Sequence, residues 1–250
     1  MIFDLLIQCY YIVIMIKAVF FDLYNTLARF KPSRYELQSQ ACESFGIDLT
    51  PEGVTNGYAI ADAYMSEQNA VMPIRLLDQD KKDKFFAEYE RLILQGSGVE
   101  VSLDKSKEIF QKVREIPYGL AIFDDVIPSI NQLHIRGLRL GMISNLNRDG
   151  DELAKSLGLD EHLDFIVTSV DVGVEKPAPK IFLEALARAG VTPQESVHVG
   201  DQPISDVDGA IRVGIIPVLI DRYNNYSDFE TCERIENMLE LPSILDRFTI

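Results

Sequence analysis

IKAVFFDLYNTL, residues 16–27, is the stretch that decides the fold. Its first half is a short, nearly continuous apolar run, which is typical of a parallel strand covered on both faces of a sheet. A carboxylate, Asp22, follows this run directly. Because an unpaired charge is costly to bury, the position indicates either a turn that the carboxylate caps or a chemical role.

Four further apolar runs repeat this pattern along the chain. They are residues 138–144, 165–169, 196–201 and 216–221. Helical patterns lie between them and end at Gly137, Gly158 and Gly190, and glycine is a preferred residue behind a helix. The alternation of strand and helix predicts an α/β fold with an open, Rossmann-like parallel sheet as its core.

The interval 29–124 interrupts the alternation, because it holds several helix signals and no convincing strand. The signals are a capping box at Ser33 and Glu36, Pro51 at a helix start behind Thr50, helical residues 81–95 and a helix start at Ser102. We therefore expect a small all-helical cap domain over 29–124 and a core made of 17–28 and 125–250. An insertion at this point lies over the ligand-binding edge of the sheet, which favours a lid.

Residues 1–16, MIFDLLIQCYYIVIMI, form an apolar N-terminal extension. They have no basic n-region and no small-residue cleavage site, and they are shorter than the ~20 apolar residues that span a bilayer. Met15 is a natural start for the first strand. We interpret the extension as the product of a start codon placed too early, or as an extra segment that lies on the core. No membrane association is expected.

Composition and charge narrow the range of partners. The chain has 250 residues, 47% of them hydrophobic, and a formal net charge of −15. Nucleic-acid binding needs clustered cations, and it is therefore not expected. The overall charge repels anions, so any phosphate site must supply its own cation. The three cysteines, Cys9, Cys42 and Cys232, are isolated, which suits a reducing cytosol and predicts a cytoplasmic protein. The sequence leaves the oligomeric state open.

Four polar motifs lie where the predicted strands end, and this edge is the binding edge of an open α/β sheet. They are Asp22 with its loop, Ser144-Asn145, Lys176 before a helix opened by prolines, and Gly200-Asp201 with Asp206. Ser144 and Asn145 can donate to an anionic oxygen, and Lys176 can neutralise an anion at a helix start. Each motif alone could be a helix or turn cap, but the ordered set is specific. His198 lies inside a predicted strand and is interpreted as a packed residue.

This ordered set resembles the haloacid dehalogenase superfamily, and the resemblance covers residues 17–221 including the cap insertion. It implies a hydrolase in which Asp22 is the nucleophile and forms a covalent aspartyl intermediate. Ser144 would bind the transferring group. Lys176 would stabilise the negative charge around nucleophile and substrate. For a phosphatase of this kind, the expected partner is a small-molecule phosphate ester.

The same resemblance implies a Mg²⁺ site. Asp201 would ligate the ion together with Asp22 and the backbone carbonyl of Tyr24. Asp206 would help to hold that site. An all-oxygen set of ligands suits Mg²⁺. The substrate-binding residues would be Thr26, which orients the loop of the nucleophile, and Asn145.

Tyr24 departs from the pattern of most phosphatases of this superfamily, which carry an aspartate two positions after the nucleophile. That aspartate protonates the leaving alcohol and then activates water, and such a general acid or base contributes ~10²–10⁴ in rate. The L-2-haloacid dehalogenases of the superfamily have tyrosine there, since a halide needs no proton. Dehalogenation is therefore one alternative. A catalytically degenerate protein that binds a phosphorylated ligand or regulates a partner is another.

Two features favour phosphate chemistry. Dehalogenases of this type need no metal and lack the Gly-Asp pair that stands here as Gly200-Asp201. They also receive the halide on a cap arginine well behind the nucleophile, whereas between Lys31 and Arg75 this chain has only Arg34, near the start of that stretch. The sequence thus predicts a Mg²⁺-dependent phosphatase that works through an aspartyl-phosphate.

Overall fold

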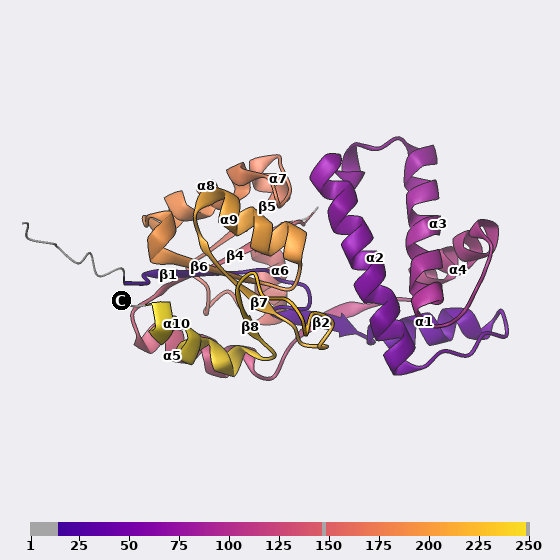
Figure 1. Cartoon of the computed structure of the whole chain (residues 1–250), viewed down its shortest axis with the longest axis horizontal. Coiled ribbons are helices and arrows are strands. Elements are labelled where there is room, and N and C mark those ends of the chain that lie inside the picture. Colours follow the sequence, from indigo (N-terminus) through magenta and orange to yellow (C-terminus); the bar gives the residue numbers. More distant parts are fainter. Residues whose placement is uncertain (1–14, 147–148, 249–250) are drawn as a thin grey trace, which may run out of the picture.

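A parallel sheet forms the core of the protein in the computed structural model, which describes residues 15–146 and 149–248 (Figure 1). Its strands are β1 (Ala18–Phe21), β4 (Arg139–Ser144), β5 (Phe165–Thr168), β6 (Ser196–Gly200), β7 (Ile216–Ile220) and β8 (Glu233–Ile235). Their order in the sheet is β5-β4-β1-β6-β7-β8, and every neighbouring pair is parallel. The predicted α/β fold with an open parallel sheet is confirmed, and all five predicted strands are present.

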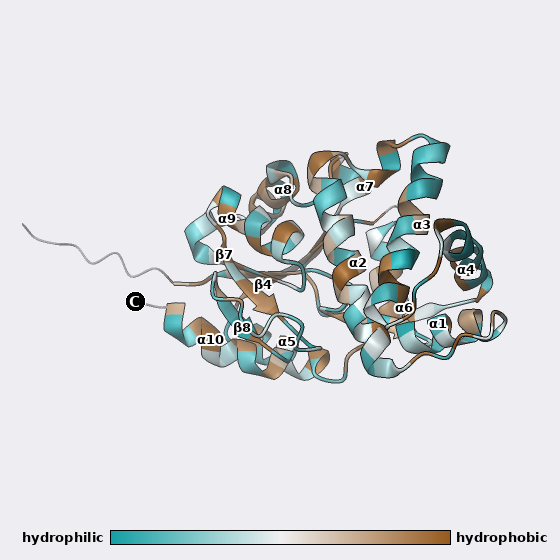
Figure 2. Cartoon of the chain, turned by 45° about the vertical axis from the view of Figure 1, so that its right-hand side comes forward, coloured by the Kyte–Doolittle hydropathy of each residue, from teal (hydrophilic) through white to brown (hydrophobic). Residues whose placement is uncertain are grey.

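Helices cover both faces of this sheet. On one face lie α5 (Val126–Ile135), α6 (Gly150–Leu157) and α10 (Leu241–Phe248), and on the other lie α8 (Pro179–Ala189) and α9 (Gly209–Val213). Short elements complete the core: α7 (Ser169–Val172), η2 (Pro193–Glu195), η3 (Pro203–Asp208) and η4 (Met238–Glu240). Alternate residues of β1 enter the two layers, Val19 and Phe21 the first, Ala18 and Phe20 the second. Figure 2 shows the resulting hydrophobic strand β4 between helices whose outer surfaces are largely hydrophilic.

The cap is a group of helices beside the sheet (Figure 1). They are α1 (Arg34–Glu43), α2 (Pro51–Val71), α3 (Gln79–Gly96) and α4 (Leu103–Glu115), with the 3₁₀ turn η1 (Ile74–Leu76) between α2 and α3. The predicted helix starts are confirmed, because Ser33 forms the capping box and Thr50 and Ser102 cap α2 and α4. At Gly57 the backbones of α2 and α3 touch, since an added Cβ would lie 2.1 Å from the carbonyl oxygen of Ile93. A side chain there would force the two helices apart.

Three strands were not predicted. β2 (Ala28–Lys31) and β3 (Gly119–Ile122) pair antiparallel in a separate ribbon, so the expectation that residues 29–124 hold no strand was wrong. Each of these strands has only four residues, too few to show a period, and its partner is distant in the chain. β8 is shorter still, with the charged residues Glu233 and Arg234 at the sheet edge. We retain the division of the chain at residues 28/29 and 124/125 as a proposal, although the first boundary falls inside β2, after its first residue, and the second lies just past β3.

The N-terminal extension can be followed only in part, since residues 1–14 lie outside the described residues. From Met15 onward the chain leads into β1, and the Lys17 N–H donates to the carbonyl oxygen of Glu195 (2.7 Å). Among the helices that the structure describes, none combines the length and the apolarity needed to cross a membrane.

The cap interior contains a buried carboxylate. Glu90, on α3, is fully buried and accepts a hydrogen bond of 3.1 Å from Nε2 of Gln38 on α1. The Oε1 atoms of both side chains have no hydrogen-bond partner among the described residues. Burial raises the pKa of Glu90 to about 7, against the lowering effect of the hydrogen bond from Gln38. The cap interior therefore contains more hydrogen-bond acceptors than donors at this position.

Replacing Glu90 by glutamine is expected to stabilise the protein at alkaline pH. The folded-state pKa of about 7 lies above the ordinary value of 4.5, so folding takes up a proton, and the stability of the wild type falls as pH rises between these values. Glutamine has the same shape, supplies the missing donor and does not titrate. Thermal unfolding should show a gain on the order of 2–3 kcal/mol at pH 8 and clearly less at pH 5. Glu43→Gln, an exposed site on α1, is the control and should show neither effect. An equal gain in stability at pH 5 and at pH 8 would show that Glu90 is ionised in the folded protein at both pH values.

Candidate active site

The binding edge of the sheet brings together polar residues that follow three neighbouring strands. Asp22 follows β1, Ser144 ends β4 and Asp201 follows β6, and β1 lies between the other two strands. The backbone N–H of Asp22 donates to the carbonyl oxygen of Val199 (2.9 Å), which continues the pairing of β1 with β6 up to the site. The parallel sheet thus places these three side chains at one edge, as the sequence pattern predicts.

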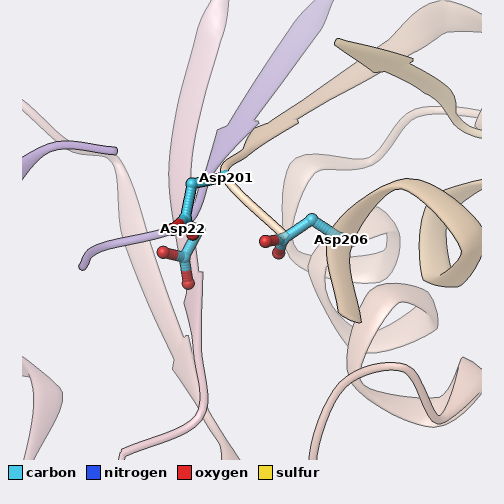
Figure 3. A group of neighbouring side chains, drawn as sticks. All are labelled: Asp22, Asp201 and Asp206. Carbon is cyan, nitrogen blue, oxygen red and sulfur yellow. The ribbon is translucent and has the colours of Figure 1, made fainter. Parts of the chain in front are cut away.

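Three carboxylates converge at this edge (Figure 3). One oxygen each of Asp22, Asp201 and Asp206 lies within 4.8 Å of the others, and we call these residues the carboxylate cluster. Asp22 and Asp206 are buried, and Asp201 is half-buried. Carboxylate oxygens are the ligands that Mg²⁺ prefers, and a divalent cation would offset the repulsion among three anions. The carboxylate cluster could therefore hold a metal ion.

Lys176 is the cation in contact with this cluster. Only 2% of Lys176 is exposed, and its Nζ donates to Oδ1 of Asp22 (2.5 Å) and to Oδ1 of Asp206 (2.6 Å). Both polar atoms of the Asn145 side chain form hydrogen bonds with the backbone of Lys176. Oδ1 accepts from the Lys176 N–H (2.7 Å), and Nδ2 donates to the Lys176 carbonyl oxygen (3.1 Å). Asn145 thus fixes the backbone from which the ammonium group extends.

The charges in the carboxylate cluster shift one another's pKa values. Burial raises the pKa of Asp22 to about 6, against the lowering effect of Lys176. Burial and the nearby Asp22 raise the pKa of Asp201 well above its ordinary value. Burial acts in the same direction on Asp206, but the charge of Lys176 and the hydrogen bond from His198 lower its pKa overall. A further cation beside Asp22 and Asp201 would stabilise their ionised forms.

Asp206 is held by neighbours that the sequence analysis did not connect with the site. Nε2 of His198 lies 2.9 Å from Oδ1 of Asp206, and the backbone N–H of Gln202 donates to Oδ2 (3.0 Å). Burial keeps the pKa of His198 below its ordinary value, so the neutral ring donates its Nε2 proton to the carboxylate. Gly200 leaves room for this carboxylate, because an added Cβ would lie 2.2 Å from Cγ of Asp206. Asp206 lies in the π-helical turn η3, a form that is frequent at functional sites.

A cavity of about 540 Å³ separates the sheet edge from the cap. The predicted site residues that line it are Asp22, Tyr24, Ser144, Asn145, Lys176, Asp201 and Asp206. A second cavity, of about 250 Å³, adjoins the first, and the lining residues that they share are Asn25, Phe30, Arg34, Asp62, Asp201 and Gln202. Thr26 is the predicted site residue that lines neither cavity.

Ser144 and Thr26 are both buried, but they differ in what they can contact. Ser144 lines the larger cavity, and its Oγ has no hydrogen-bond partner in the described part of the chain, so it can donate to an anionic ligand. Thr26 has no exposed surface. Its carbonyl oxygen accepts hydrogen bonds of 3.1 and 2.7 Å from Arg222, which also pairs with Asp125 (2.9 Å). Arg222, which the sequence analysis did not single out, thus holds the loop that follows Asp22 in place through hydrogen bonds to its backbone.

Tyr24 connects the loop that follows Asp22 to the ribbon. It lines the larger cavity, and its ring stacks on Phe30 of β2 with centroids 5.6 Å apart and 19° between the planes. The guanidinium of Arg34 lies 5.4 Å from the centroid of the same Phe30 ring. Where most phosphatases of the superfamily have an acid, this chain therefore has an aromatic side chain that packs toward the cap.

The cap contributes a polar cluster that the sequence analysis missed. Nη1 of Arg34 donates to Oδ2 of Asp62 (2.7 Å), and the Tyr89 hydroxyl donates to Oδ1 of Asp62 (2.6 Å). The Arg34 guanidinium also lies 4.3 Å from the centroid of the Tyr58 ring. These residues come from α1, α2 and α3, and their pairing leaves no periodic signal in the sequence. Arg34, Asp62 and Tyr89 line the larger cavity, as the carboxylate cluster does.

Comparison with known proteins places this geometry in a family. The haloacid dehalogenase-like hydrolase family matches residues 16–214. A glyceraldehyde 3-phosphate phosphatase of Methanopyrus kandleri is 43% identical over 109 residues, which span 43% of this chain and less than half, 46%, of that protein. Its namesake in Methanothermobacter thermautotrophicus is 29% identical over 215 residues, 83% of this chain and 86% of that protein. A 2-haloacid dehalogenase structure from Pseudomonas syringae has a TM-score of 0.54 at 27% identity, covering 94% of this chain and 100% of that one. The fold of this chain, its site and the family match over residues 16–214 together show that the chain belongs to the haloacid dehalogenase-like hydrolases.

Proposed function

We propose that this hydrolase is a Mg²⁺-dependent phosphatase that acts on a small phosphorylated metabolite through an aspartyl-phosphate at Asp22. The observation that carries the proposal is the carboxylate cluster, joined by Lys176, at the wall of the larger cavity. Two relatives named glyceraldehyde 3-phosphate phosphatase support it, one of them over most of its length. A Mg²⁺ ion on the carboxylate cluster and on the Tyr24 carbonyl oxygen would supply positive charge to the phosphate.

In the proposed reaction, a carboxylate oxygen of Asp22 attacks the phosphorus atom and the ester P–O bond breaks. The leaving oxygen departs with the electron pair and takes a proton from water. Lys176 offsets the charge of Asp22 and of the phosphoryl oxygens, and Ser144 donates from Oγ to one of those oxygens. Water then attacks the aspartyl-phosphate at phosphorus, which releases phosphate and restores Asp22.

Two residues expected to bind the substrate have positioning roles in this proposal. Asn145 acts through Lys176, because its amide is hydrogen-bonded to the backbone of that residue. Thr26 acts through the Asp22 loop, because its side chain is fully buried and its carbonyl oxygen is held by Arg222.

Dehalogenation is the second candidate, and Tyr24 is the residue that favours it, together with the similar 2-haloacid dehalogenase structure. Arg34 and Arg75 are cap arginines that line the cavity and could receive a halide. The pairing of Arg34 with Asp62 (2.7 Å) and of Arg75 with Glu175 (3.0 Å) competes with that role. A degenerate phospho-ligand-binding protein is the third candidate, and the meeting of Asp22, Lys176 and the other site groups in one cavity weighs against it.

Mg²⁺ is expected to bind the protein and to raise its melting temperature. A ligand that binds only the folded state stabilises it by about 2.7 kcal/mol at a concentration one hundred times its Kd. Asp201→Asn should abolish most of this gain and, without metal, should itself stabilise the protein, because burial and the nearby Asp22 raise the pKa of the half-buried Asp201. Calorimetric titration and thermal unfolding with and without Mg²⁺ measure both effects. Asp62→Asn, in the same cavity but outside the carboxylate cluster, is the control. Mg²⁺ binding that is unchanged in Asp201→Asn would contradict the proposed site.

Tyr24→Asp is expected to accelerate the hydrolysis of alkyl phosphates. Without a general acid, the wild type should hydrolyse p-nitrophenyl phosphate much faster than glycerol 3-phosphate, since the departing oxygen must carry its charge unaided. An aspartate should narrow this gap by on the order of tenfold or more, although it loses the stacking on Phe30 and adds charge beside Asp22. Values of kcat/KM for both esters, with Tyr24→Asn as the control of equal size, test this. Equal rates for the two esters in the wild type would show that another group supplies the proton.

A further inference from the structure

The larger cavity has four cationic side chains in its wall. Three of them pair with carboxylates of the same wall: Lys176 with Asp22 and Asp206, Arg34 with Asp62 (2.7 Å), and Arg75 with Glu175 (3.0 Å). The fourth is Lys82, whose ammonium group has no ion pair and no hydrogen bond within residues 15–146 and 149–248. Among the cations of the cavity wall, Lys82 is therefore the one that no described residue pairs with.

The surroundings of Lys82 make this charge effective. Lys82 is half-buried in α3, and Phe86 and Tyr89, which follow it at helical spacing, line the same cavity. Met65 of α2 and Ile74 of η1 add apolar side chains to this part of the wall. An ammonium group beside apolar walls is less hydrated than one on an open surface, so it attracts an anion more strongly. A free cation here is a specific feature, because carboxylates outnumber cations both in the cavity wall and in the whole chain.

We propose that Lys82 binds a carboxylate on the leaving group, so that the substrate is a phosphorylated carboxylic acid. The proposal rests on the phosphatase function proposed above. Asp22 and Lys176 hold the phosphate from the core, and Lys82 holds the second anion from the cap, across a cavity whose 540 Å³ suit a small metabolite. A carboxylate fits better than a second phosphate, since it brings a single charge to a single unpaired cation.

Two esters of equal length test the assignment. 3-Phosphoglycerate and glycerol 3-phosphate share the phosphate and the three-carbon chain, and they differ in a carboxylate against a hydroxymethyl group. Their binding to the Asp22→Asn protein with Mg²⁺ is measured by calorimetry, which needs no turnover. The carboxylate ester should bind about tenfold more tightly or better. Adding Lys82→Met should erase the preference and Lys82→Arg should retain it. Adding Lys84→Met, at an exposed lysine of the same helix, should leave it unchanged.

The outcomes separate this inference from the function on which it rests. Equal affinities for the two esters, or a preference that persists in Lys82→Met with an unchanged melting temperature, would overturn the role of Lys82. Turnover of p-nitrophenyl phosphate by the wild type with Mg²⁺ tests the phosphatase function separately. If that turnover is absent while the tenfold preference depends on Lys82, the carboxylate site stands and the phosphatase function fails.

Discussion

Replacing Asp22 by asparagine is expected to lower kcat by on the order of 10⁴-fold or more for every substrate that the wild type accepts. An amide is too weak a nucleophile, and both the phosphatase and the dehalogenase reactions need the carboxylate. The fold should survive the change. Asparagine fills the same space and removes a carboxylate whose pKa burial raises, and Lys176 keeps its ion pair with Asp206. Melting temperature and kcat, measured on the same preparation, separate loss of activity from loss of structure.

Asp208→Asn is the control for this substitution, because Asp208 is an exposed carboxylate of η3 outside the cavity and should keep full activity. Deamidation of the new asparagine would restore aspartate, so intact mass must accompany each assay. Substantial turnover by an Asp22→Asn protein of the correct mass would contradict the nucleophile assignment.

Lys176→Met is expected to destabilise the protein by about 3–5 kcal/mol at neutral pH and to abolish activity. The lysine is buried between Asp22 and Asp206, and methionine would leave two buried carboxylates without their counter-charge. The loss should depend on pH. Without Lys176 the pKa of Asp22 rises further above its ordinary value, and the pKa of Asp206 rises because it loses the charge that lowers it. The stability of the variant is then highest at acidic pH and falls as pH rises through these values.

Urea unfolding at pH 5 and pH 8, for wild type and Lys176→Met, measures this effect. Mg²⁺ should recover part of the loss at pH 8, because it supplies positive charge to the same carboxylates. Lys180→Met, at an exposed lysine whose ammonium group donates to the Val172 carbonyl oxygen (2.9 Å), is the control and should cost little stability. If the free energy of unfolding of Lys176→Met is only slightly below that of the wild type, and by the same amount at both pH values, Lys176 does not neutralise the carboxylates.

The ends of the strands made the core side of the site predictable. Asp22, Ser144 and Asp201 each follow or end an apolar run, and a parallel sheet places such ends at one edge. The proximity of these three side chains therefore follows from the local apolar patterns and from the parallel arrangement of the strands. The helix starts of the cap were predictable for a similar reason, since the capping box at Ser33 is a local signal.

The cap side of the cavity depends on contacts that no local pattern specifies. Arg34 meets Asp62 because α1 packs on α2, and Arg222 reaches the carbonyl oxygen of Thr26 from 196 residues along the chain. His198 was correctly expected to be buried, but its bond to Asp206 depends on how η3 folds back over β6. These pairings depend on three-dimensional packing, which hydrophobic periodicity does not describe.

The measurement that tests the central claim most directly compares phosphate release from p-nitrophenyl phosphate with halide release from L-2-chloropropionate, each with Mg²⁺ and with EDTA. The account predicts phosphate release that requires Mg²⁺, and no halide release in either condition. Halide release that persists in EDTA, without phosphate release in Mg²⁺, would contradict it and establish the dehalogenase alternative.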